Sequence, residues 1–213
     1  MNVVAKILRG DNVRPTRLHT EAGEYCGLDA VSGIFPAATS WLRQKVTGQY
    51  SVQPWWVYAA IDKVKSSLRP TDWVLEVGAG YSTLWLAQRC QSVCSIEESE
   101  AWSKIVSTQA HDLRLNNVEI LSGESRSFFS DQIVARQWDV VIIDGPRERL
   151  EIFRDLLGAA KHPRLVIYDD TDKAENRTAL QWLAPDYKSH IYRGFKPQTL
   201  HVCETTVFER AIR

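Results

Sequence analysis

The sequence has 213 residues, of which 44% are apolar, and its 26 Lys and Arg residues are balanced by 26 Asp and Glu residues. This composition predicts one globular domain with a sizeable core, and the balanced charge argues against nucleic acid or an anionic membrane surface as a partner. The four cysteines form no CxxC pair and are predicted to be free thiols. Residues 1–19 contain only short apolar stretches interrupted by charge, so we expect neither a signal peptide nor a membrane span and a cytoplasmic location.

The N-terminal part of the chain has no sustained periodicity. Residues 1–53 mix charge, glycine and proline and are predicted to form an irregular lead segment. Residues 54–68 place apolar side chains at helical spacing after Pro54, which predicts a helix that opens the main domain, residues 54–213. The adjacent indoles of Trp55 and Trp56 are expected to pack in the core or in a lid, and the alternative is that an exposed indole covers a planar or cationic ligand.

The segment 73–87, WVLEVGAGYSTLWLA, predicts a strand, a tight turn and a helix. Gly78 and Gly80 allow the backbone to turn sharply and to bring its amides close to a ligand. A dinucleotide-binding fingerprint, GxGxxG, would have a third glycine where this chain has Thr83. The turn therefore favours a different nucleotide-type ligand, and an NAD(P)-binding oxidoreductase is the alternative.

Acidic residues end the strands on either side of this turn. Glu76 precedes the glycines, where it would repel a pyrophosphate but pair with a cationic amino-acid head group. Glu97, followed by Glu98, ends the next apolar run at about the chain distance at which an acid binds ribose hydroxyls in a βαβ unit. S-adenosylmethionine has an amino-acid end that could pair with Glu76 and a ribose that could bind Glu97, so the two acids fit this cofactor. A solvated strand end is the alternative for either acid alone.

Apolar runs alternate with helical patterns from residue 73 onward, which is typical of a parallel sheet covered by helices. Strands are predicted at residues 73–77, 93–97, 118–121, 138–143 and 164–168. Two further runs, 187–192 and 202–210, also have strand character. The connection between them is too short for a crossover helix, so they are predicted to form an antiparallel hairpin.

Polar residues follow the later strands, at the sheet edge where open α/β sheets bind ligands. Gly123 and Glu124 come after the third strand, and Glu124 fits a helix N-terminal acid as well as a ligand contact. Asp144 ends the fourth strand and is the best single catalytic candidate. Asp169 and Asp170 end the fifth strand, and their crowding requires a nearby cation or helix amides to offset it.

The segments EVGAGYS, SIEES, IDGPRER, IYDDTD and GFKP followed by TTVFER together resemble a branch of the class I S-adenosylmethionine-dependent methyltransferases, across residues 54–210. The resemblance implies a Rossmann-like, mostly parallel seven-stranded sheet with helices on both faces and a C-terminal antiparallel hairpin. It implies methyl transfer, most simply to an oxygen of a small molecule or sugar, beneath a lid formed by the segment ahead of the first strand. The implied cofactor site consists of Glu76, Gly78, Gly80, Ser82, Thr83, Glu97, Glu98, Gly123, Glu124 and Asp144.

The expected catalytic residues are Asp144 and Asp169, which would orient or deprotonate the acceptor. With Asp170, they also resemble the ligands that hold Mg²⁺ in catechol-type O-methyltransferases. That pattern has a lysine where this chain has Arg147, and Asp-Asn where this chain has Asp-Asp. The alternative is that the Asp-Asp pair caps a helix or binds acceptor hydroxyls. A non-catalytic member of the fold, which binds cofactor or a partner, is also consistent with the sequence, and the oligomeric state is not specified by it.

Overall fold

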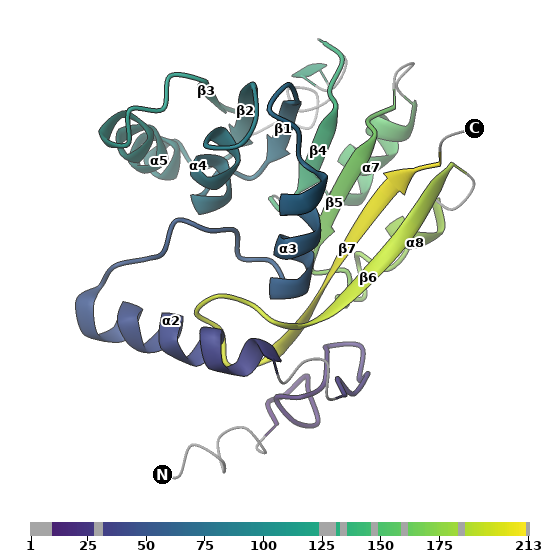
Figure 1. The fold of residues 1–213 in the computed structure, drawn as a ribbon. Helices are drawn as coiled ribbons and strands as arrows, with labels where there is room; N and C mark the ends of the chain where they lie inside the picture. The colour runs from purple at the N-terminus through teal and green to yellow at the C-terminus, as the bar shows by residue number, and fades with distance from the viewer. Residues whose placement is uncertain are drawn as a thin grey trace.

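The computed structural model describes residues 10–27, 32–123, 131–132, 136–145, 149–158, 162–182 and 186–211. Within them lies a seven-stranded sheet with the strand order β3-β2-β1-β4-β5-β7-β6 (Figure 1). The strands are β1 (Trp73–Val77), β2 (Ser92–Glu97), β3 (Val118–Ser122), β4 (Val140–Ile143), β5 (Leu165–Asp169), β6 (Tyr187–Phe195) and β7 (Val202–Arg210). Strands β1 to β5 pair in parallel, whereas β7 lies antiparallel between β5 and β6. The predicted mostly parallel sheet with a C-terminal hairpin is confirmed.

Helices cover both faces of this sheet, as predicted. They are α2 (Ile34–Thr47), α3 (Tyr58–Ser67), α4 (Tyr81–Ala87), α5 (Glu100–Asp112), α7 (Arg149–Gly158) and α8 (Ala179–Trp182). In Figure 1, α3 and α4 lie in front of the sheet, and α7 and α8 lie behind it. The helix expected from Pro54 begins at Tyr58 instead, because Val57 is extended and its N–H donates to Thr205 Oγ1 on β7. None of the helices in the described ranges has the length and apolar character to cross a membrane.

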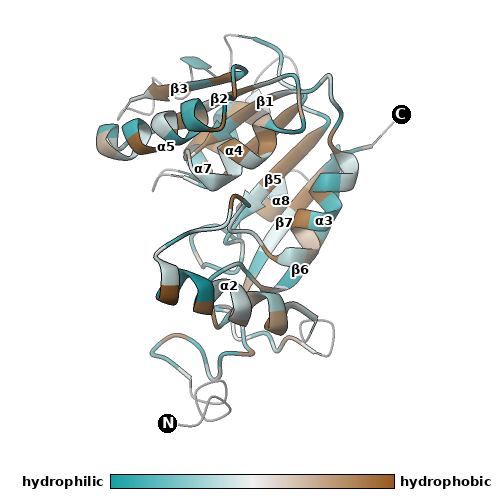
Figure 2. Ribbon diagram, turned by 60° about the vertical axis from the view of Figure 1, so that its left-hand side comes forward, coloured by the Kyte–Doolittle hydropathy of each residue, from teal (hydrophilic) through white to brown (hydrophobic). Residues whose placement is uncertain are grey.

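The central strands bury both of their faces. In β4, Val140 and Ile142 belong to the apolar cluster that includes α3 and α4, whereas Val141 and Ile143 belong to the cluster that includes α7. Strands of this kind are continuous apolar runs rather than alternating patterns. Figure 2 shows the apolar colouring along β1 and β5, next to the mixed hydrophilic and apolar colouring of α3. Burial on both faces explains why these strands stand out in the sequence.

The N-terminal part contains more regular structure than its sequence indicated. The expectation of an irregular lead is wrong for residues 34–47, which form the 14-residue helix α2. This helix ends at Gly48, whose φ of 67° provides a left-handed C-cap. Among its residues only Ala37 is buried, while Phe35 and Val46 are exposed. Its apolar residues nonetheless recur at helical spacing, as Ile34, Ala37 and Trp41 show, so the sequence does indicate a helix here and the expectation of an irregular lead overlooked it.

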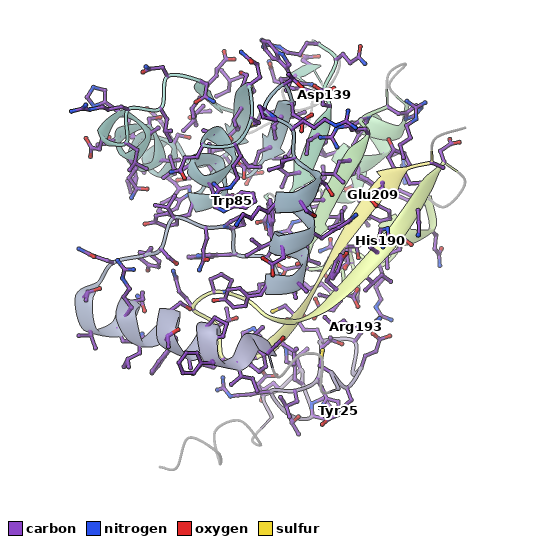
Figure 3. The ribbon with its side chains drawn as sticks, in the orientation of Figure 1. Tyr25, Trp85, Asp139, His190, Arg193 and Glu209 are labelled. Carbon is purple, nitrogen blue, oxygen red and sulfur yellow. The ribbon has the colours of Figure 1, made fainter. Side chains whose placement is uncertain are left out.

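The segment ahead of the first strand reaches the carboxyl end of the sheet. The N–H of Val202 donates to the carbonyl of Arg17 at 2.9 Å, which ties the segment to the start of β7. Arg193 of β6 forms an ion pair with Glu24 at 2.5 Å. In Figure 3, Arg193 lies beside the N-terminal segment, at the opposite end of the sheet from Asp139, which precedes β4. The N-terminal segment is thus placed where the parallel strands end.

Candidate functional site

The turn after β1 depends on its two glycines for different reasons. Gly78 has a φ of 98°, and a Cβ built on it would lie 2.5 Å from Gly145 Cα, in the loop after β4. Only glycine fits at this crossing of two backbones. Gly80 is extended, with φ −176°, and a Cβ there would meet only Ser82 Oγ, at 3.8 Å. Gly78 therefore serves the fold, and Gly80 keeps space open in front of the turn.

Glu76 lies beneath this turn and is fully buried. Its Oε2 accepts hydrogen bonds from Thr83 Oγ1 at 2.5 Å and from Ser95 Oγ at 2.6 Å, and Thr83 Oγ1 in turn accepts the N–H of Gly80 at 2.9 Å. Burial raises the pKa of Glu76 to about 7, although the hydroxyls of Ser82, Ser95 and Thr83 oppose this shift. The carboxylate supports the turn from behind, and its Oε1 has no hydrogen-bond partner among the described residues.

Glu97 binds the same turn from β2. Its Oε2 accepts the N–H of Ala79 at 3.1 Å, and its Oε1 accepts the N–H of Ser99 at 2.9 Å. A carboxylate has further lone pairs, and half-buried Glu97 can accept more donors. Gly123 lies next to it, because its N–H donates to the carbonyl of Glu97 at 3.1 Å. Glu98 is exposed at the same strand end, and the predicted contact of Glu124 lies outside the described residues.

A cavity of about 450 Å³ opens in front of the turn. One side of its wall is formed by residues 78–82, which include the predicted Gly78, Gly80 and Ser82, together with the indole of Trp102. This indole is fixed by its own hydrogen bond to the carbonyl of Ala79, at 2.8 Å. Glu76 and Glu97 are not part of the described wall. The structure therefore places both acids one layer behind the surface that a ligand would touch.

The rest of the cavity wall includes strand-end aspartates and lysines. Lys196, in the β6–β7 connection, donates to Asp169 Oδ2 and to Asp170 Oδ1, at 2.5 Å each. Lys173 donates to the other oxygen of Asp170 at 2.7 Å. The Lys196 side chain is buried, and attraction to Asp169 and Asp170 outweighs that burial and holds the pKa of Lys196 well above its ordinary range. The cation that the crowded aspartates were predicted to need is confirmed as Lys196.

Asp144, after β4, lines the same cavity. Its Oδ2 accepts the indole N–H of Trp56 at 3.1 Å, and its Oδ1 lies 3.9 Å from the guanidinium of Arg149. Arg149 also donates to the carbonyls of Gly145 at 3.0 Å and Asp169 at 3.1 Å, so it clamps the two strand ends together. Burial raises the pKa of Asp144 to about 6, although Arg149 opposes the shift. A carboxylate with a pKa near neutrality is suited to accept a proton.

Asp169, the last residue of β5, and Asp170, which follows it, differ in their pKa. Burial raises the pKa of Asp169 to about 8, opposed by Lys196 and reinforced by repulsion from Asp170 and Asp144. The Oδ1 of Asp169 accepts the hydroxyl of Thr205 at 2.5 Å. For Asp170, burial is outweighed by Lys196 and Lys173, which hold its pKa well below the ordinary range. Asp170 is the fixed anion of the cluster, and Asp169 and Asp144 are its titrating members.

The predicted magnesium site does not fit this arrangement. The oxygens of Asp169 and Asp170 that face each other are bridged by the Lys196 ammonium, which occupies the position a metal ion would need. The described residues contain no group of three or more His, Cys, Asp or Glu side chains that could hold a metal. We therefore assign no metal role to Asp144, Asp169 or Asp170. The prediction of Mg²⁺ followed from the acids alone and did not include the lysine.

Sequence reasoning missed Lys196 as a site residue and treated it only as part of a hairpin connection. The antiparallel pairing of the last strand could have located it. Because β7 pairs antiparallel with β5, with Asp169 opposite Thr205, the residues just before β7 must lie beyond the carboxyl end of β5. A lysine there comes next to the Asp-Asp pair. Of the two indoles expected to pack, Trp56 is buried and also donates a hydrogen bond to the site, whereas Trp55 is exposed and lines the cavity.

No family model matches the sequence, and no curated protein matches it. Solved structures do share its fold. The O-methyltransferase TomG from Streptomyces achromogenes, involved in tomaymycin synthesis and solved with SAM, is 18% identical, with a TM-score of 0.60 over 83% of this chain and 90% of that one. An O-methyltransferase from Bacillus cereus, solved with SAH, is 16% identical, with a TM-score of 0.59 over 83% of this chain and 99% of that one.

An rRNA methylase from Streptococcus thermophilus has a TM-score of 0.55 and 16% identity, over 73% of this chain and 96% of that one. These likenesses show that the chain has the class I S-adenosylmethionine-dependent methyltransferase fold, as its sequence resemblance implied. At such low identity they show the fold alone. Because the fold is shared by an rRNA methylase and by O-methyltransferases, it does not support the expected exclusion of nucleic acid as an acceptor.

Proposed function

We propose that the protein is an enzyme that transfers a methyl group from S-adenosylmethionine to an oxygen of a small hydroxylated molecule or sugar. One observation carries the proposal: the glycine turn of a methyltransferase fold and a cluster of titrating carboxyl groups wall the same cavity of about 450 Å³. Asp144 and Asp169 line this cavity together with the turn, and the N–H of Asp144 donates to the carbonyl of Val77, just before Gly78. A cofactor on the turn and an acceptor beside the carboxyl groups would meet there.

The residues of the turn fit the proposed cofactor. Gly80 leaves room for a ligand close to the backbone, and the unpartnered, buried Oε1 of Glu76 is an acceptor for which a donor is expected, either a water molecule or the cofactor amino group. Glu97 holds the N–H of Ala79 and keeps lone pairs for ribose hydroxyls. Trp102 offers an indole surface in the wall for the adenine. Glu76 would thus act mainly by supporting the turn.

Methyl transfer requires little of the protein beyond alignment of the acceptor with the cofactor and removal of a proton from the acceptor. The sulfonium of the cofactor supplies an already activated methyl group, so in-line positioning of the acceptor oxygen is the main remaining task. Asp144 is our candidate proton acceptor, since its pKa of about 6 leaves it ionised at neutral pH. Trp56 and Arg149 hold its carboxylate in place. Asp169 would accept a hydrogen bond from the acceptor or share its proton.

The cavity wall favours a polar acceptor of modest size. Arg14, Lys173, Thr199 and His201 add hydrogen-bonding groups beyond the aspartates, which suits a hydroxyl-rich molecule. Arg14 belongs to the N-terminal segment, and its presence in the wall supports a lid role for residues 1–53. The even charge of the chain disfavours a nucleic-acid acceptor. A nicotinamide dehydrogenase is disfavoured by Thr83 in place of the third glycine and by the antiparallel β7.

Calorimetry with S-adenosylhomocysteine (SAH), the demethylated product, and with NADH tests the cofactor assignment. We expect SAH to bind in the micromolar range and NADH not to bind. Labelled S-adenosylmethionine offered with a panel of hydroxylated metabolites, sugars and RNA fragments then tests the acceptor class. Binding of NADH without SAH would refute the proposal, and SAH binding without turnover on any acceptor would favour a non-catalytic member of the fold.

A further inference from the structure

The acceptor side of the cavity contains a cation that is part of the chain. Lys196 is only 6% exposed, and its ammonium lies 2.5 Å from one oxygen of Asp169 and 2.5 Å from one oxygen of Asp170. Two converging carboxylate oxygens can also be part of the ligand set of a hard divalent ion, since Mg²⁺ is commonly bound through one or two carboxylates together with water. Here that position is taken by a nitrogen that the backbone carries between β6 and β7.

The carboxyl groups around this nitrogen already have cationic partners. Arg149 approaches Asp144 at 3.9 Å and Asp170 at 3.8 Å, and Lys173 lies 2.7 Å from Asp170. Counting Lys196, three cations therefore surround Asp170, Asp144 and Asp169, and burial already raises the pKa of Asp169 to about 8 despite them. A divalent ion added to this cluster would have to displace the ammonium and would leave an excess of buried positive charge, which is unfavourable where water is excluded.

The ammonium retains a donor for a ligand. A protonated lysine has three N–H donors, and two of those on Lys196 are directed to Asp169 and Asp170. The same side chain lines the cavity opposite the glycine turn. The remaining N–H is therefore available to an oxygen of a molecule in the cavity.

We propose that Lys196 is the built-in cation of the acceptor site: its ammonium takes the place of a divalent metal between Asp169 and Asp170 and donates a hydrogen bond to the acceptor oxygen. Methyl transfer at this site then needs no metal ion. The statement about transfer rests on the proposed function, whereas the exclusion of metal by Lys196 does not. The two parts can be tested separately.

The test is titration of the purified protein with Mn²⁺, followed by electron paramagnetic resonance of the free ion. Wild-type protein should show no specific site. Lys196→Ala, which leaves the carboxylates without their central cation, should bind one Mn²⁺ at least tenfold more tightly than wild type, in competition with Mg²⁺. Lys173→Ala is the matched control, because it removes a lysine from Asp170 but leaves the Lys196 bridge intact, and it should behave as wild type. Lys196→Arg should also exclude the ion.

Stoichiometric, Mg²⁺-competed Mn²⁺ binding by wild type would overturn the proposal, and so would folded Lys196→Ala that gains no affinity. If Lys196→Ala does not fold without metal, its refolding yield with and without Mn²⁺ decides, since rescue by the ion supports the proposal and no rescue opposes it. SAH binding is measured on each sample. Failure of wild type to bind SAH would count against the proposed function and leave the Mn²⁺ comparison unaffected. Once an acceptor is found, wild-type transfer should be unchanged by EDTA.

Discussion

The two sides of the cavity are built on different principles. The cofactor side comes from one continuous stretch of chain, in which Gly78 and Gly80 shape the backbone and Glu76 and Glu97 hold it from behind. The acceptor side is assembled from side chains that are distant in sequence, such as Trp56, which meets the residue after β4. The first side positions a ligand through backbone, and the second through charge.

This difference decides which changes each side tolerates. A backbone turn fails when a side chain is added to it, because there is no room or no allowed conformation. A charge cluster fails when a partner is removed, because a buried ion loses its compensation. We therefore expect substitutions on the cofactor side to lower cofactor affinity and substitutions on the acceptor side to lower turnover.

Asp144→Asn should have the largest effect on turnover. It keeps the size of the side chain and an acceptor for Trp56, but it cannot take a proton, so kcat should fall about 10²–10⁴-fold. SAH affinity should change by less than about threefold, since charge on the acceptor side does not hold the turn.

The pH dependence gives a second readout of Asp144. Wild-type kcat should rise through about pH 6 as Asp144 loses its proton, and Asp144→Asn should lack this rise. Asp62→Asn, at an exposed aspartate of α3, is the control. Unchanged kcat in Asp144→Asn would remove Asp144 from the mechanism.

The two glycines should separate folding from binding on the cofactor side. Gly78→Val places a side chain at positive φ and against the Gly145 backbone, and it should cost about 3 kcal/mol or more of unfolding free energy. Gly80→Val should change stability by less than about 1 kcal/mol, because its Cβ has room. Its side chain enters the cavity, so SAH affinity should fall more than about thirtyfold. Urea unfolding and calorimetry measure the two effects, and equal loss of stability in both variants would contradict the distinction.

The same contrast explains what could be predicted from the sequence. The cofactor side is local: the run ending at Glu76, the glycines and the acid at Glu97 lie in two neighbouring strand-turn units, and the strands are continuous apolar runs because both faces are buried. The acceptor side is not local. Lys196 reaches Asp169 only because β7 inserts beside β5, and a lysine in a hairpin connection has no motif of its own. Helix α2 is a different case, because its apolar residues do recur at helical spacing and the expectation of an irregular lead overlooked that local pattern.

Glu76→Gln should show that the ionised carboxylate of Glu76, buried beneath the turn, destabilises the folded protein at high pH. The pKa of Glu76 is raised from 4.5 to about 7 in the folded protein. The protonated form is therefore favoured by folding, and the stability it contributes is present below about pH 4.5 and is lost as pH rises through 7. Glutamine does not titrate, so the variant should gain about 3 kcal/mol relative to wild type between pH 4.5 and pH 8. Urea unfolding at both pH values measures this difference, and a gap that stays constant with pH would contradict the shift.

Glu97→Ala tests whether an acid behind the cavity wall still contributes to cofactor binding. The substitution removes the acceptor for the N–H of Ala79 and the lone pairs that we assign to the ribose. SAH affinity should fall by about 1.5–3 kcal/mol, the scale of charge-assisted hydrogen bonds. Glu98→Ala is the matched comparison, because Glu98 lies at the same strand end but is exposed, and we expect a smaller loss. Calorimetry with SAH measures both. Equal losses would mean that the negative potential of the strand end matters rather than the Glu97 contacts, and no loss in either variant would confine cofactor recognition to the turn.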